Sequence, residues 1–355
     1  MRSISIKTVF TVAALSALAA APAAAQVLDP FYAPFYTLTS HGAVPGVPLP
    51  YGGLTFASDD GNILLIGGSA NSTIADIYRI RISRDAESHM QGFDCGGSTF
   101  FADANGVTGG IDGGLGYGPG DVLFYSTYSD NHLGQIRPGS TGPDRLIALS
   151  TVGVAPSTGT LQFVPAGLPG AGKLKVISWS ASRWYSLVVT PDGAGTYDVA
   201  PDSPSVDLFI GGGPEGLVFI EAGNPGFPVA SVLVCEWSAG RVVSYEIDGN
   251  GDPIPATQRP FITGLSGAEG AAIDPVTGDF LFSTFGGGNQ IIRVSGFTSI
   301  EPCTGDINLD GVVNLTDLAL LLATFGGPGA GDLNADCITD LSDLALLLGN
   351  FGRTC

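Results

Sequence analysis

The residues whose types and spacing point most clearly to chemistry lie near the end of the chain, in one pattern that occurs twice. Residues 306–317 are D-I-N-L-D-G-V-V-N-L-T-D, and residues 332–343 are D-L-N-A-D-C-I-T-D-L-S-D. Oxygen-bearing residues fall at loop positions 1, 3, 5, 9 and 12, and position 7 offers a carbonyl, which is the spacing of a calcium-binding loop. The predicted ligands are Asp306, Asn308, Asp310, Val312, Asn314 and Asp317, then Asp332, Asn334, Asp336, Ile338, Asp340 and Asp343. The alternative is a pair of acidic turns before amphipathic helices.

Position 6 of such a loop has a positive φ, which Gly311 accommodates in the first copy and which strains Cys337 in the second. Behind each loop, apolar residues recur at spacings of 0, 3, 4 and 7, which predicts one apolar helix face per copy. These residues are Leu318, Leu321, Leu322 and Phe325, then Leu344, Leu347, Leu348 and Phe351. Two such short helices bury too little to fold alone, so we expect calcium binding to supply the remaining stability.

The two loops, each followed by a single helix, resemble dockerin modules over residues 303–355. The resemblance implies two bound Ca²⁺ ions, a cohesin-like partner and an association with extracellular polysaccharide breakdown. It also implies antiparallel helices that bring the end of the chain back to the first loop, where Cys303 and Cys355 would form a disulfide. The positions with which family members grip cohesin are unusual here, because position 10 is leucine in both copies, Leu315 and Leu341.

The first 25 residues have the pattern of a secretory signal peptide. Arg2 and Lys7 precede and flank an apolar run over residues 9–20, and three alanines at 23–25 form a cleavage site before Gln26. The apolar run is too short to cross a bilayer, which takes roughly 20 residues, and no later stretch is long enough. We therefore expect an exported protein, secreted or periplasmic, without a membrane span.

The composition excludes one class of partner and indicates a class of fold. The net charge is −19 with only 14 Lys and Arg residues, which argues against nucleic acid because phosphate binding needs clustered positive charge. The 53 glycines and 24 prolines indicate many short strands joined by turns. Because five is an odd number, at least one cysteine stays free or pairs between chains. Cys235 lies in an apolar strand and is expected to be a buried free thiol, whereas Cys95 and Cys337 have no assigned partner.

Residues 34–297 contain a degenerate repeat of a short apolar strand, a polar turn, a second strand ending in an aromatic residue, and a third strand. The anchors of the first strands are Leu54, Leu115, Leu161, Leu217 and Ala271, at spacings of 61, 46, 56 and 54 residues. A fourth strand follows in every repeat but the last, where a matching segment at residues 35–40 is available from the N-terminus. A β-propeller closes in this way. The repeat resembles propellers of the NHL and gluconolactonase-like type.

The sequence thus predicts a mainly β protein, a five-bladed β-propeller with a small α-helical, EF-hand-like module at its C-terminus. Six blades are the alternative, because the spacing of 61 residues has room for one more, and a β-sandwich or a solenoid is a different solution. The expected domains are a signal peptide at 1–25, the propeller at 26–297, a linker at 298–305 and the calcium module at 306–355.

Two features recur at one level of the repeat. Glu215 and Glu269 each begin a first strand, with Asp112 one residue out of step, and first strands line the axis of a propeller. These carboxylates either converge to hold a cation or face the channel as solvated structural groups. The second strands end in aromatic residues that either pack between blades or rim a ligand site. These aromatic residues are Tyr128, Trp179, Trp237 and Phe285.

Other patterns that could support catalysis are missing. The three histidines, His41, His89 and His132, lack the spacing of zinc ligands or of a triad. The acidic run at residues 248–252 has no position-12 ligand, so a polar β-turn is predicted there. The functional hypothesis is an exported, non-catalytic binding or scaffolding protein with a possible glycan on the propeller face, tethered through its calcium module. The alternative is a propeller hydrolase, lactonase or lyase that acts on a sugar or sugar acid.

Overall fold

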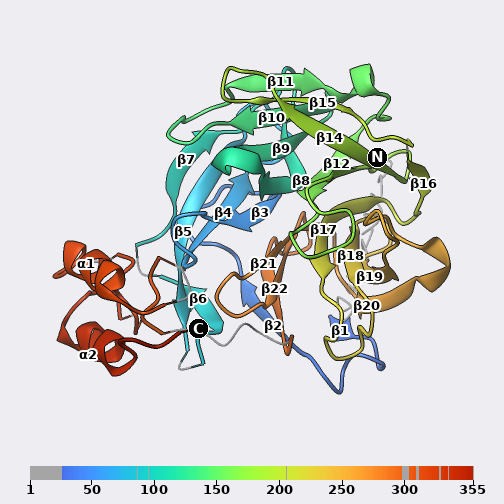
Figure 1. Ribbon diagram of the computed structural model, residues 1–355. Helices are drawn as coiled ribbons and strands as arrows, with labels where there is room; N and C mark the ends of the chain where they lie inside the picture. The colour runs from blue at the N-terminus through green and yellow to red at the C-terminus, as the bar shows by residue number, and fades with distance from the viewer. Residues whose placement is uncertain are drawn as a thin grey trace, which may run out of the picture.

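The chain forms a five-bladed β-propeller followed by a small helical module (Figure 1). The computed structural model describes residues 26–354 except 86, 95, 205, 298–303, 309–311, 328 and 335. The expected signal peptide, the expected Cys303–Cys355 disulfide, Asp310 and most of the expected linker therefore lie outside the described residues. Among the helices that are described, none is long and apolar enough to cross a membrane.

Each blade is an antiparallel sheet whose first strand lies innermost. Blade 1 contains β3 (Leu54–Phe56), β4 (Ile63–Gly68), β5 (Asp76–Arg84), β6 (Met90–Phe93) and β7 (Thr99–Asp103). Blade 2 contains β8 (Gly110–Tyr117), β9 (Leu123–Tyr128), β10 (His132–Ile136) and β11 (Arg145–Ala148). Blade 3 contains β12 (Thr158–Phe163), β13 (Leu174–Ser178), β14 (Arg183–Pro191), β15 (Tyr197–Pro201) and β16 (Asp207–Phe209).

The remaining two blades share the N-terminal strands. Blade 4 contains β17 (Pro214–Ile220), β18 (Ser231–Glu236), β19 (Arg241–Glu246), β20 (Arg259–Thr263) and, at its outer edge, β1 (Val27–Leu28). Blade 5 contains β21 (Ala268–Ile273), β22 (Phe280–Thr284), β23 (Ile291–Ser295) and β2 (Thr37–Gly42). Three short 3₁₀ helices lie in connections: η1 (Pro119–Asp121), η2 (Leu149–Val152) and η3 (Pro255–Thr257).

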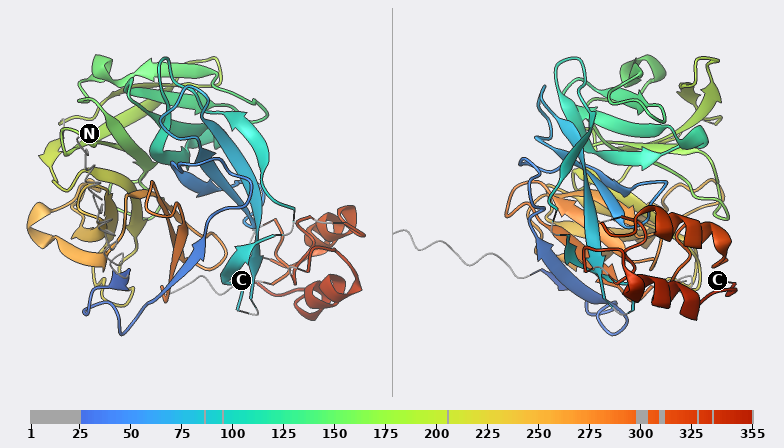
Figure 2. Two further views of the ribbon diagram at one scale, coloured as in Figure 1. Left: turned by 180° about the vertical axis from the view of Figure 1, so that it is seen from behind. Right: turned by 90° about the vertical axis from the view of Figure 1, so that its left-hand side faces the viewer.

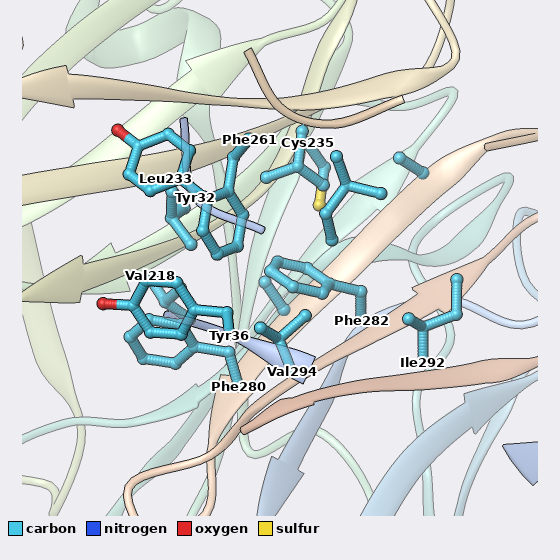
Figure 3. Close-up of a cluster of buried hydrophobic side chains, with 14 of the residues drawn as sticks. Tyr32, Tyr36, Val218, Leu233, Cys235, Phe261, Phe280, Phe282, Ile292 and Val294 are labelled. Atoms are coloured by element: carbon cyan, nitrogen blue, oxygen red, sulfur yellow. The ribbon is translucent and has the colours of Figure 1, made fainter. Parts of the chain in front are cut away.

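The second strands are apolar on both faces because the blades stack face to face around the axis. β4 is I-L-L-I-G-G and β18 is S-V-L-V-C-E, and every residue of both strands is buried. A sheet covered on both sides selects continuous apolar runs instead of strict alternation. Cys235, in β18, is a buried free thiol, as the sequence predicts, and it packs in the core between blades 4 and 5 (Figure 3).

The long first spacing contains no sixth blade. After β5 the chain forms β6, which pairs with one end of β5, and β7 then pairs with its other end. Blade 3 has the same arrangement, because β15 and β16 both pair with β14. The extra residues of these two repeats therefore extend the outer edge of an existing blade, and the prediction of five blades is confirmed.

The N-terminal segment closes the ring, as predicted. β2 pairs with β23, starting from Thr37 opposite Ser295, and supplies the fourth strand of blade 5. The sequence did not indicate the second contribution, in which β1 pairs with β20 of blade 4. Between β1 and β2, Tyr32 and Tyr36 enter the core formed by blades 4 and 5, beside Phe261 (Figure 3). The N-terminal segment thus joins two blades and removes a free edge.

A buried ion pair joins blades 3 and 4. Lys175 is fully buried, and its Nζ donates to Oδ1 of Asp252 at 2.6 Å, to Oγ of Ser186 at 2.8 Å and to the carbonyl of Asn250 at 2.9 Å. Trp184 donates its Nε1–H to the same Asp252 oxygen at 2.8 Å. Residues 248–252 form the predicted turn, and its last carboxylate has a structural role that the sequence pattern did not reveal.

The C-terminal module lies outside the ring beside β6, and both turned views show the same placement (Figure 1 and Figure 2). Its helices are α1 (Leu315–Ala323) and α2 (Leu341–Gly349). Each begins at a capping box formed by two loop residues, Asn314 with Asp317 and Asp340 with Asp343. The same residues therefore define the loop and start the helix, since loop positions 9 and 12 are also the N-cap and N3 residues of the helix.

The hydrophobic core of the C-terminal module is small. Among the apolar side chains that the structure describes there, only Val313, Leu321 and Leu347 are fully buried, with Leu318 and Leu344 partly buried. The other four residues of the predicted faces are 45–53% exposed, namely Leu322, Phe325, Leu348 and Phe351. Two nine-residue helices with no third layer can bury only the side chains between them, so half of each predicted apolar face stays exposed.

Cys337 connects the second loop to its surroundings. It has a φ of 77°, as position 6 of the loop requires. It is disulfide-bonded, to a partner outside the described residues, and its Sγ lies 2.7 Å from Oδ1 of Asp94, the residue that follows β6 by one position. The second calcium-type loop therefore contacts blade 1.

Candidate functional site

Three carboxylates face the propeller axis because each lies in a bulge of an innermost strand. The pairing registers of β8, β17 and β21 with the next strand each shift at one place, and Asp112, Glu215 and Glu269 lie within these shifts. A bulge re-aims a side chain that would otherwise follow the pleat. The bulge of β8 contains one residue more than the other two, which explains why Asp112 is one position out of step in the sequence.

The three carboxylates converge at the axis. One oxygen from each lies within 4.8 Å of an oxygen of the other two. Asp112, Glu215 and Glu269 are only 2%, 4% and 2% exposed, and each has a buried oxygen with no hydrogen-bond partner among the described residues. None of the ion pairs in the described part of the chain includes any of the three. This cluster therefore carries acidic charge without a compensating basic side chain.

The electrostatics of the cluster follow from this burial. Burial raises the pKa of the Asp112 carboxyl to about 7, although hydrogen bonds with Glu269, Asn71 and Gly113 act in the opposite direction. Burial, and then the negative charge of Asp112, raise the pKa of Glu215 well above its usual value. Burial, followed by the charges of Glu215 and Asp112, has the same effect on the pKa of Glu269. The unliganded protein thus binds protons at this site more tightly than exposed carboxylates do.

The aromatic residues at the ends of the second strands stand around the same point. A pocket of about 210 Å³ is lined by Asn71, Asp112, Tyr128, Trp179, Glu215, Trp237, Glu269 and Phe285. The rings of Trp179 and Trp237 meet edge to face with centroids 6.0 Å apart, and those of Trp237 and Phe285 with centroids 6.4 Å apart. All four aromatic side chains are half-buried. The structure therefore brings together all six residues that the sequence singled out on the propeller face.

The backbone fixes the aromatic residues at equivalent places in successive blades. The N–H groups of Trp179, Trp237 and Phe285 donate to carbonyls just before the bulges of β12, β17 and β21, at 2.8, 2.9 and 2.7 Å. Each ring is thus held beside the innermost strand of its own blade. Contacts between rings of different blades also form, so inter-blade packing and a pocket rim are both present in this geometry.

Sequence reasoning missed the contribution of blade 1. Asn71 follows β4 by three residues, in the segment that carries aromatic residues in the other blades. It has a φ of 66°, its N–H donates to the carbonyl of Ile111 at 3.0 Å, and its Oδ1 has no hydrogen-bond partner among the described residues. Asparagine tolerates the left-handed region better than most residues. Because Leu54 pairs with Ile66, the repeat position of the aromatics is Ser69 in blade 1. Asn71 lies two residues beyond it, so the repeat offered no signal for Asn71.

The pocket combines two kinds of recognition. Half-buried rings present apolar faces, and the buried carboxylates and the Asn71 amide offer hydrogen-bond acceptors at the base. A second, shallower hollow of about 470 Å³ adjoins it and is lined by Trp179, Ser180, Ser182, Gly212, Gly213, Ser238 and Ala239. Trp179 lines both hollows.

The two calcium-type loops share one hydrogen-bond pattern. The position-12 carboxylates, Asp317 and Asp343, are buried, and Oδ1 of each accepts the backbone N–H groups of loop positions 2 and 3. Oδ2 of each accepts the N–H of position 9. In the second loop, Asp332 accepts the N–H groups of Asp336 and Cys337 at 3.2 and 3.0 Å. The other predicted ligands that are described lie on the same loops, namely Asp306, Asn308, Val312, Asn314, Asn334, Ile338 and Asp340.

The donor chemistry of these loops fits Ca²⁺, since every predicted ligand atom is an oxygen, and position 6 of the second loop, Cys337, has the required positive φ. Among the described residues, three carboxylates come within 4.8 Å of one another in the axial cluster. The four carboxylates of the second loop form no such group. The loop carboxylates are instead bonded to backbone N–H groups and to the amide of Asn334.

Several solved structures are similar in fold. They include a candidate 6-phosphogluconolactonase from Bacteroides uniformis, at 16% identity over 68% of this chain and 66% of that one, with a TM-score of 0.37. The PQQ-bound aldose sugar dehydrogenase from Streptomyces coelicolor has 14% identity over 72% and 83%, with a TM-score of 0.38. The PQQ domain of pyranose dehydrogenase from Coprinopsis cinerea has 9% identity over 76% and 97%, with a TM-score of 0.42. No family model and no curated protein sequence matches the chain.

Proposed function

We propose that the propeller is a ligand-binding domain whose axial pocket accepts one sugar unit of a glycan. The observation that carries this proposal is that four aromatic rings and three buried carboxylates line one pocket of about 210 Å³. Sugar rings have apolar C–H faces that stack on aromatic rings and hydroxyl groups that donate to carboxylates. A pocket smaller than the roughly 300–1,000 Å³ of typical ligand sites suits a single unit.

The adjoining hollow favours a chain of sugars over a monosaccharide. Trp179 lines both hollows, and the second one is bordered by the hydroxyl-bearing residues Ser180, Ser182 and Ser238. A second unit linked to the first would lie against the same indole side chain. The ligand class that this arrangement supports is therefore an oligosaccharide or the end of a polysaccharide.

The C-terminal module would serve as the tether of an exported protein. Its support is the duplicated oxygen-donor pattern, for two Ca²⁺ ions, and the leucines that both helices leave exposed, such as Leu322 and Leu348 at 53% each. An exposed apolar surface of this kind is typical of a protein-binding site, and a cohesin-like protein is the proposed partner. The signal-peptide pattern of residues 1–25 supports export, and the whole proposal places the protein in extracellular polysaccharide breakdown.

A glycan array followed by calorimetry on the chain from Gln26 tests the binding proposal. Trp179→Ala is expected to weaken binding of the best glycan by about fivefold, because loss of a stacking contact costs on the order of 1 kcal/mol. Phe100→Ala is the matched control, since Phe100 is 52% exposed on the outer strand of blade 1. Equal affinity of the Trp179 variant and the wild type would exclude the pocket as the binding site.

A propeller hydrolase, lactonase or lyase is the second candidate, and the convergence of three carboxylates at the base of the pocket is the observation that favours it. Paired carboxylates supply the acid and base of glycoside cleavage. Mass spectrometry of the best-binding glycan after incubation separates the two functions. An unchanged glycan identifies a binder, and products that disappear with Glu215→Gln and Glu269→Gln identify an enzyme.

A further inference from the structure

The acidic cluster on the propeller axis contains carboxylate oxygens for which the described residues provide no hydrogen-bond partner. Oδ2 of Asp112, Oε2 of Glu215 and Oε1 of Glu269 are all buried and lack hydrogen-bond partners among the described residues. Because a buried carboxylate without a counter-charge is costly, an unassisted cluster of three would destabilise the native state. Blades 1 and 3 contribute glycines at the equivalent positions, Gly52 and Gly159, so no basic side chain enters the cluster from these blades.

We propose that Asp112, Glu215 and Glu269 bind a divalent cation of the Ca²⁺ class on the propeller axis. Oxygens no more than 4.8 Å apart can all lie within about 2.8 Å of one point, close to the roughly 2.3–2.6 Å of Ca²⁺–oxygen bonds. All three donors are oxygens, which hard cations prefer over softer transition metals. The unpartnered Oδ1 of Asn71, which lines the same pocket, is a fourth oxygen donor from blade 1.

The open side of this site is the aromatic-rimmed pocket. Four protein oxygens leave positions free on a cation that takes six to eight ligands, and these positions face the space that the proposed sugar would occupy. The inference rests on the same pocket as the proposed function and deepens it: sugar hydroxyls would complete the coordination of the ion, so that ligand binding depends on the cation. The cation site itself requires no sugar, and its test uses none.

The competing explanation is that the carboxyls are protonated and bond to one another. Hydrogen bonding between Asp112 and Glu269 is compatible with a shared proton. The two explanations differ in what Glu→Gln variants lose. A shared-proton cluster binds no metal and tolerates glutamine, whereas a metal site loses a ligand with each substitution.

Luminescence of Tb³⁺, a Ca²⁺ mimic, distinguishes this site from the two loops in the full chain. Tb³⁺ emits after excitation of a nearby tryptophan. Trp179 and Trp237 line the axial pocket, whereas residues 303–355 contain no tryptophan. We expect tryptophan-sensitised emission from the wild type that excess Ca²⁺ suppresses. Glu215→Gln and Glu269→Gln should each lose most of this emission, while Asp336→Asn, in the second loop, should keep it.

Glu221→Gln is the matched control, because Glu221 is an exposed residue directly after β17, the strand that carries Glu215. It should emit like the wild type. Circular dichroism establishes that each variant is folded, and Asp112→Asn replaces any glutamine variant that is not. Absence of sensitised emission in the wild type, or full emission in the Glu215 and Glu269 variants, would overturn the cation site. Either result would also remove the cation from the proposed mode of sugar binding, but it would leave binding by the aromatic rings to be measured separately by the glycan array.

Discussion

The side chain of Glu215, in blade 4, occupies the position that a side chain at Gly159, in blade 3, would take. A Cβ added to Gly159 would lie 2.3 Å from Oε2 of Glu215 and 2.7 Å from the carbonyl oxygen of Pro214. Real Cβ atoms do not approach other atoms so closely, so the missing side chain of blade 3 makes the room for the buried carboxylate of blade 4. The acidic cluster thus depends on two residue types at the same repeat position.

Gly159→Ala is expected to lower the free energy of unfolding by about 1–3 kcal/mol, because the added methyl group overpacks a buried site against backbone. It should also abolish tryptophan-sensitised Tb³⁺ emission by displacing Glu215. Denaturant unfolding and luminescence measure the two effects. Gly249→Ala is the control, since nothing lies within 4 Å of a Cβ there, and its stability should stay within about 0.5 kcal/mol of the wild type. Wild-type behaviour of the Gly159 variant would refute this packing argument.

Alanine variants of two tryptophans, one in the pocket rim and one in the core, should differ in how much stability they lose. Trp237 is half-buried in the pocket rim, and its ring contacts those of Trp179 and Phe285 edge to face. Trp237→Ala should therefore cost about 1–3 kcal/mol of stability, at roughly 0.5–1.5 kcal/mol for each of its two aromatic pairs, and should lose glycan binding. Trp184 is fully buried between blades, so Trp184→Ala should cost about 3–5 kcal/mol. Thermal melts of both variants give the comparison. Equal costs would assign Trp237 to the core and remove it from the binding site.

Chelation of metal should loosen the C-terminal module without unfolding the propeller. Val313, Leu321 and Leu347 are the only apolar side chains completely buried in the described part of the module, so ion binding must supply much of its stability. Hydrogen–deuterium exchange of the full chain in chelator should speed up in α1 and α2, while the outer strands β10, β14 and β19, which contribute no ligand to any proposed cation site, keep their protection. Asp336→Asn should produce the change in α2 even with Ca²⁺ present. Helix exchange that is indifferent to chelator would contradict a calcium-dependent module.

Cys337 combines a strained backbone with a disulfide, and two variants separate these effects. Cys337→Ser removes the disulfide and keeps a side chain at a φ of 77°, whereas Cys337→Gly removes both. Under oxidising conditions both variants should be less stable than the wild type, because loss of a native disulfide typically costs about 2–5 kcal/mol. The free energy of unfolding of the glycine variant should exceed that of the serine variant by about 1 kcal/mol. Calcium titration calorimetry and exchange at α2 measure the difference, and equal behaviour of the two variants would mean that the loop carries no strain at this residue.

The sequence by itself determined the features that depend on local backbone and on repetition. Its 26-residue duplication located both loops and both helix starts, since the capping residues are loop residues as well. Its strand pattern located the blades and the closing β2. It also placed Glu215, Glu269 and the four aromatic residues at one level, because equivalent positions of a propeller repeat lie at equal heights around the axis.

Only the tertiary structure decided what depends on contacts between blades. The bulge that turns Asp112 toward the axis, the entry of Asn71 from blade 1 and the space left by Gly159 all arise from the packing of distant segments, which no local period encodes. The same holds for β1 and β6, which add to sheet edges, and for Leu322 and Leu348, which stay exposed because the small module has no further layer to cover them. Periodicity reports which face a residue is on, whereas burial and convergence depend on what the rest of the chain places opposite that face.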